Sequence, residues 1–167
     1  MKICLCSVPV EGMDEKPSRL RSEGSLGIVP KVAIVSLIKW MERNGWKSNS
    51  YKFYDIDMLF PSDDDIKKFF GEYQPTIVGL SAVVSSSYDQ VIRISSIIRK
   101  MCPDAWIVVG GNLADSAEVL LSKTETDVCV LGDGEIAWVN FINYVEKYKR
   151  DWNYEALGRI KGLCYFN

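Results

Sequence analysis

The sequence predicts an α/β protein built on a doubly wound, parallel, five-stranded sheet. Two observations lead to this fold class: five apolar runs of strand length alternate with five segments of helical periodicity, and two of the runs end in glycines, at Gly110-Gly111 and at Gly132. The chain has 167 residues, which is enough for one domain with a single sizeable core.

The predicted strands are short and apolar, as expected of strands buried on both faces. They cover residues 2–8, 51–55, 76–83, 106–109 and 127–131. Parallel neighbours need helical, right-handed crossovers. We therefore expect the flavodoxin-like strand order 2-1-3-4-5, in which ligands bind at the carboxyl ends of strands 1 and 3.

Each predicted helix has one apolar face. The helices cover residues 30–44, 63–71, about 87–101, 114–122 and 136–148. Pro30 is a favoured first helical residue, and Gly45 is a natural stop signal. Ser86 and Ser87 each fit a capping box for the third helix, so N-capping alone can account for this serine run.

Two segments depart from the alternation. Residues 9–29 form a polar stretch with several Gly and Pro, and a loop of this length at the ligand edge is usually functional. Residues 151–167 are expected to be a linker and the start of a following domain, with a strand opening at 162–166. We thus expect an α/β domain over residues 1–150, taken from a longer protein.

Composition excludes several functions. The net charge is -2 and the basic residues are scattered, so nucleic acid is not an expected partner. The apolar run near the N-terminus is too short for a signal peptide or membrane span, and we expect a cytoplasmic protein. Five cysteines at irregular spacing make no disulfide framework, and we expect Cys4 and Cys6 to pack in the core. Histidine is absent, which removes His-based catalysis and leaves the chemistry to a bound group.

The usual ligands of this architecture lack their signatures here. No G-x-G-x-x-G follows the first strand, and VPVEGMDEKPS is no compact flavin-phosphate loop. The third strand ends in Ser81-Ala82-Val83, so a phospho-receiver has no acceptor aspartate. What remains is a rim of small residues, which suits a large, flat or elongated ligand. The glycines could instead serve only as tight turns into the helices. The rim comprises Ser81, Gly110, Gly111, Asn112, Gly132, Gly134 and Glu135.

Taken together, these segments resemble a known family. GLSAV, then PDAWIVVGG, then TDVCVLGDGE follow one another as in the N-terminal, Rossmann-like cobalamin-binding domain of cobalamin-dependent radical-SAM enzymes. GDGE stands where that family usually has GEGE. The resemblance implies that cobalamin is the cofactor and a partner of this domain. It assigns cofactor binding to Ser81, Ala82, Val83, Gly110, Gly111, Asn112, Gly132, Gly134 and Glu135.

The resemblance also sets limits. The D-x-H-x-x-G motif of other cobalamin domains is absent, so cobalamin is expected base-off with no histidine on cobalt, which favours methyl transfer or related radical chemistry. The C-x-x-x-C-x-x-C motif for a [4Fe-4S] cluster and S-adenosylmethionine is also absent, and we expect these groups in a downstream radical-SAM domain. Two alternatives stay open: a ligand-free interaction or scaffold domain, and a flavin or nucleotide domain of unusual sequence.

Overall fold

The computed structural model describes residues 1–10 and 31–166. Most of the predicted functional loop, and Pro30 as a helix start, lie outside the described residues. The strands form one sheet in the order β2-β1-β3-β4-β5-β6. The strands are β1 (Ile3–Ser7), β2 (Tyr51–Asp55), β3 (Ile77–Ser81), β4 (Trp106–Gly110), β5 (Val128–Val130) and β6 (Leu163–Cys164).

The first five strands are parallel and follow the predicted order, and the parallel β1–β3 pairing places the ends of these two strands side by side. The prediction of five strands was one short, because β6 pairs antiparallel with β5. Gly162 has a φ of +86°, and its carbonyl accepts a hydrogen bond from Leu131 N at 2.8 Å. The strand expected at 162–166 therefore joins this sheet at its edge.

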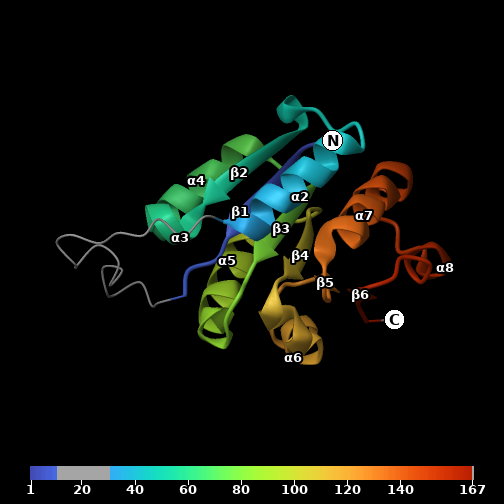
Figure 1. The fold of residues 1–167 in the computed structure, drawn as a ribbon. Coiled ribbons are helices and arrows are strands. Elements are labelled where there is room, and N and C mark those ends of the chain that lie inside the picture. The colour runs from blue at the N-terminus through green and yellow to red at the C-terminus, as the bar shows by residue number, and fades with distance from the viewer. Residues whose placement is uncertain (11–30, 167) are drawn as a thin grey trace.

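Helices cover both faces of the sheet (Figure 1). One face lies under α2 and α7, and the other lies under α4, α5 and α6. The longer helices are α2 (Val32–Arg43), α4 (Asp63–Tyr73), α5 (Tyr88–Met101), α6 (Ala117–Lys123) and α7 (Gly134–Tyr148), and the short ones are α3 (Ile56–Leu59) and α8 (Tyr154–Leu157). The predicted fourth helix is a 3-10 helix (Asn112–Ser116) followed by α6.

Alternation along the strands divides the core into two parts. Cys4, Cys6 and Val109 face α4, α5 and α6, whereas Leu5 and Val108 face α2 and α7. Both thiols of the C-x-C pair are fully buried, which confirms that they pack in the core. The capping prediction for the third helix was wrong: the N-cap of α5 makes no side-chain cap bond, because a 3-10 turn (Ser85–Ser87) precedes the helix.

The C-terminal tail packs on the α7 side of the sheet. Leu157 is fully buried, and the Trp152 ring lies 4.6 Å from the Trp106 ring, centroid to centroid. The boundary expected at residue 150 stays a prediction, but these contacts favour counting residues 151–166 with the α/β domain.

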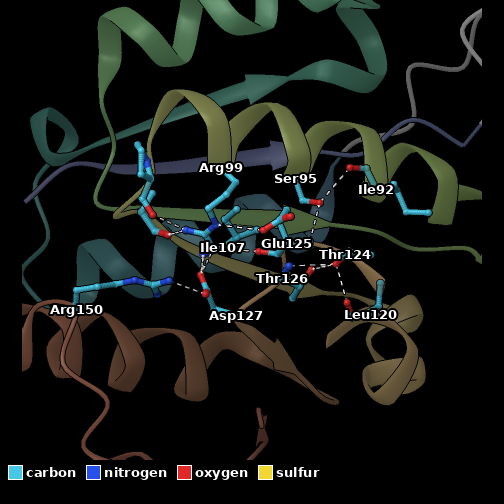
Figure 2. Close-up of polar contacts among 12 residues, drawn as sticks. Ile92, Ser95, Arg99, Ile107, Leu120, Thr124, Glu125, Thr126, Asp127 and Arg150 are labelled. Carbon is cyan, nitrogen blue, oxygen red and sulfur yellow. Dashed lines mark hydrogen bonds and ion pairs between the residues drawn. The ribbon is translucent and has the colours of Figure 1, made fainter. Parts of the chain in front are cut away.

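Charged side chains join the amino ends of β4 and β5 (Figure 2). The Asp127 carboxylate accepts hydrogen bonds from Arg99 at 2.8 Å, from Arg150 at 2.6 Å and from the Ile107 backbone N–H at 2.8 Å. Arg99 also donates to the backbone carbonyls of 103, 105 and 125. The Arg150 guanidinium lies over the Trp106 ring, 4.2 Å from its centroid. This network fixes the end of the sheet opposite the predicted ligand edge.

Candidate functional site: a cavity at the carboxyl ends of the strands

A cavity of about 230 Å³ lies at the carboxyl ends of β1, β3, β4 and β5, beneath α2 and α7. The strands and the turns that follow them contribute Leu5, Gly79, Leu80, Ser81, Val108, Gly110, Gly111, Asn112, Val130 and Gly132 to its lining. The helices and the turn before α7 contribute Ala33, Ile34, Leu37, Asp133, Gly134, Glu135 and Trp138. The cavity therefore occupies the edge at which doubly wound sheets bind their ligands.

The cavity exists because the last positions on this face carry small side chains. Ser81 and Gly110 are register partners at the ends of β3 and β4. Side chains alternate along a strand, so Gly110 shares the face of Val108. A Cβ added to Gly110 would have no neighbour nearer than the Val130 Cβ at 4.0 Å. A larger side chain at this position would therefore fill the cavity.

Gly111 has a different role from Gly110. Its φ is +88°, and an added Cβ would lie 2.5 Å from the Ala82 carbonyl oxygen. That contact is part of a backbone turn, since Ala82 N donates to the Gly110 carbonyl at 2.9 Å and Leu113 N donates to the Ala82 carbonyl at 3.1 Å. Glycine is required here by the fold itself.

Polar side chains lie at the mouth of the cavity, where a hydrogen bond joins the two covering helices, α2 and α7. Ser36 Oγ on α2 donates to Glu135 Oε1 on α7 at 2.5 Å. The α7 N-cap, Asp133, makes no side-chain hydrogen bond to the first turn. Backbone N–H groups of a helix's first turn have no partner within the helix, and here they open beside Gly132 and Gly134.

The family comparison agrees with this geometry. The model of the B12 binding domain family matches residues 24–142. The chain belongs to the B12 binding domain family. Over 86 residues this B12 binding domain is 31% identical to cytidylyl-2-hydroxyethylphosphonate methyltransferase of Streptomyces wedmorensis, a match that covers 49% of the chain and 16% of that protein.

A solved structure shares the fold. The apo form of OxsB, described as a cobalamin-dependent S-adenosylmethionine radical enzyme, superposes with a TM-score of 0.65 at 16% sequence identity. The match covers 99% of this B12 binding domain and 20% of the OxsB chain. The chain thus spans about a fifth or less of the length of both relatives.

Seven of the nine residues predicted to bind the cofactor line the cavity. They are Ser81, Gly110, Gly111, Asn112, Gly132, Gly134 and Glu135. Ala82 and Val83 are not among the lining residues: β3 ends at Ser81, after which Ala82 is buried in the core of the opposite face and Val83 is exposed. The predicted strand extended two residues too far, because an apolar run does not reveal where backbone pairing stops.

Sequence reasoning missed the inner lining of this B12 binding domain. Trp138 and Leu37 fall on the apolar faces of helices, and Gly79 lies within a strand. Helical periodicity predicts that such residues point inward. It does not distinguish a side chain that fills the core from one that borders a cavity, and that distinction depends on what lies opposite.

Metal-ligating and thiol groups occur in the part of the chain that the structure describes. Within residues 1–10 and 31–166, no cluster of three or more His, Cys, Asp or Glu could hold a metal ion. Burial raises the pKa of the Cys6 thiol, and the Cys4 thiol 3.6 Å away adds to this shift. Over the same part of the chain, no helix is long and apolar enough to cross a membrane.

Proposed function

We propose that this domain binds cobalamin and holds its nucleotide tail in the cavity between the sheet and helices α2 and α7. The observation that carries the proposal is the space beside Gly110, where the nearest atom to an added Cβ is 4.0 Å away at a strand end of a B12 binding domain. Uncovered backbone at this position lets a bulky group approach the sheet directly.

The size of the cavity supports a tail and not a whole cofactor. Pockets that enclose an entire small ligand usually measure roughly 300–1,000 Å³. A cavity of about 230 Å³ suits one appended group, with the flat ring outside at the strand ends. The Ser81 hydroxyl and the first-turn N–H groups of α7 are suited to donate to the sugar and phosphate of such a tail.

The chain contains no histidine, so no imidazole from it can bind cobalt. Cobalamin held with its tail in the cavity would therefore be base-off without a histidine ligand. When bound, the cofactor would supply an alkyl-cobalt centre for methyl transfer or related radical chemistry. The residues described above bind and orient it, and they enclose the tail away from water.

The parent protein is proposed to be a radical-SAM enzyme by analogy with OxsB, and methyl transfer is proposed by analogy with the Streptomyces methyltransferase. A [4Fe-4S] cluster and S-adenosylmethionine would then belong to another domain, with which this one would associate. We place the protein in the cytoplasm, because none of its five cysteines forms a disulfide.

Titration of the 167-residue chain with hydroxocobalamin tests the proposal, followed by the visible spectrum and by calorimetry. We expect saturable binding of one equivalent and a base-off spectrum. Gly110→Phe should weaken binding by at least 100-fold while the thermal unfolding curve stays two-state, because the ring would occupy the cavity. Val119→Phe, on an exposed position of α6, is the matched control and should leave binding unchanged.

The alternative is an interaction or scaffold domain that has kept the fold without the ligand. No heat and no spectral change at high micromolar cobalamin would favour this alternative and sink the proposal. Unchanged affinity in Gly110→Phe would instead show that cobalamin binds elsewhere on the domain.

A further inference from the structure

The last two strands of the sheet place two cysteines opposite each other. Cys129 on β5 is the register partner of Cys164 on β6 in the antiparallel pair that joins the C-terminal strand to the sheet. Both are free thiols in the structure. Cys129 lies in the part of the core under α4, α5 and α6, and Cys164 packs against the same part. The two side chains therefore leave neighbouring strands on the same face of the sheet.

The spacing of paired strands matches the geometry of a disulfide. Opposed residues of an antiparallel pair have Cα atoms about 4.5 or 5.5 Å apart, depending on the hydrogen-bond pattern. Cysteines joined by a disulfide have Cα atoms roughly 4.4–6.8 Å apart. Both spacings fall within this range, so rotation of the Cys129 and Cys164 side chains can join them while β5 and β6 stay paired.

The two thiols differ in their access to solvent. Cys129 is fully buried, and burial raises the pKa of its thiol to about 12. Cys164 is partly exposed, whereas the other four cysteines of the chain are buried, so a dissolved oxidant reaches Cys164 first. The sulfurs of Cys4 and Cys6 lie 3.6 Å apart, but both residues are fully buried and share one strand. Exposure therefore favours reaction at the pair on β5 and β6.

A bond between these cysteines would fasten the C-terminal segment to the sheet. β6 has only two residues and lies at the sheet edge, and a short edge element of this kind opens easily. The disulfide would close a loop of about 35 residues that contains α7 and α8, and closing such a loop lowers the entropy of the unfolded chain. Oxidation should therefore stabilise the domain.

We propose that Cys129 and Cys164 form a redox-sensitive pair, which a small disulfide such as oxidised glutathione converts to a protein disulfide. The Cys164 thiolate attacks one glutathione sulfur, whose S–S bond breaks and releases one glutathione. Cys129 loses its proton and attacks the Cys164 sulfur, and the second glutathione leaves. The two protein thiols lose two electrons and two protons, and oxidised glutathione takes up both to become two thiols. The second step is the slower one and speeds up with rising pH, because the buried Cys129 thiol is protonated at neutral pH.

The test treats the dilute, full 167-residue chain with oxidised glutathione under native, mildly alkaline conditions. We expect a monomer that has lost two hydrogen atoms by mass spectrometry, and a digest in which the peptides of Cys129 and Cys164 are linked. The midpoint of thermal unfolding should rise by at least about 5 °C, and dithiothreitol should reverse the rise. A persistent glutathione adduct on Cys164, a disulfide-linked dimer, no reaction or an unchanged midpoint would overturn the inference.

Two variants separate this pair from the other thiols. Cys164→Ser changes a partly exposed position, so the variant should fold, and it should lose both the intramolecular bond and the rise in the midpoint. Cys102→Ala, at a buried position under the same face, is the matched control and should keep both. An intramolecular disulfide that still forms in Cys164→Ser would overturn the inference. If Cys102→Ala fails to fold, the linked peptides of the unaltered chain decide.

Discussion

The two ends of β4 and β5 are built in opposite ways. At the amino ends, the Asp127 carboxylate accepts hydrogen bonds from two arginines and a backbone N–H, so polar contacts join the two strands (Figure 2). At the carboxyl ends, the nearest atom to a Cβ added at Gly110 would be 4.0 Å away, and a Cβ added at Gly132 would meet no atom within 4 Å. The sheet is therefore held by charged contacts at one end and left with open space at the other, a division common in proteins that bind through a rigid scaffold.

The largest effect on stability is expected at the carboxyl end of β4, where Gly111 is required by the fold and Gly110 borders the cavity. Gly111→Ala should lower the free energy of unfolding by roughly 3–4 kcal/mol, since it forces a side chain into a backbone region nearly reserved for glycine and against the Ala82 carbonyl. Urea unfolding measures this loss. The matched Gly110→Ala should change stability by less than about 1 kcal/mol, because its Cβ enters open space. Equal losses at both glycines would remove the distinction drawn between them.

Asp127→Ala tests the charged network at the amino ends of β4 and β5. Removing the carboxylate leaves Arg99 and Arg150 without their shared partner, and we expect a loss of about 3 kcal/mol in the free energy of unfolding. The cobalamin dissociation constant of the folded variant should not change, since the cavity is at the other end. Asp104→Ala, in an exposed turn before β4, is the control for losing one acidic charge. A weakened affinity in Asp127→Ala would show that the two ends are coupled.

Cys129 is the middle residue of β5, between the two ends compared above. Its buried thiol should make the stability of the domain depend on pH. Burial, with a smaller contribution from Cys164, raises the pKa of the Cys129 thiol to about 12. An unfolded thiol ionises near pH 8.5, so this group's contribution to stability is complete below that pH and is lost as the pH rises toward 12. From this thiol we expect the domain to be about 2 kcal/mol less stable at pH 10 than at pH 8. Cys129→Ala should reduce the difference by that amount in urea unfolding, and an unaltered pH dependence would contradict the prediction.

The smallest effect concerns the mouth of the cavity. Ser36→Ala removes the hydrogen bond to Glu135 that joins α2 to α7, and should lower stability by about 1 kcal/mol. It should also speed cobalamin dissociation in stopped-flow experiments, because the covering helices are held less firmly. Ser122→Ala removes a hydroxyl bonded only within its own helix, and serves as the control. Equal dissociation rates in the two variants would show that the bridge does not retain the ligand.

Much of the fold could be predicted from particular residues. The apolar runs gave five strands in the right order, and the pair Gly110-Gly111 marked the correct edge of the sheet. The two-residue strand at Leu163–Cys164 has no periodicity of its own, so its antiparallel pairing with β5 could not be foreseen. The same holds for Trp138, whose helical position predicted burial but not a place at the end of a cavity.

The alternation of strands and helices, the glycines at the strand ends and the absence of histidine can be read from the amino-acid sequence alone, because local patterns and composition carry this information. The three-dimensional packing was needed to show that Gly111 is required by a backbone turn while Gly110 borders the cavity, and that Ala82 and Val83 are not among the lining residues. Neighbouring residues on a strand point to opposite faces, and a turn can redirect them again. The role of each small residue is therefore set by what packs against it, and that partner comes from elsewhere in the chain.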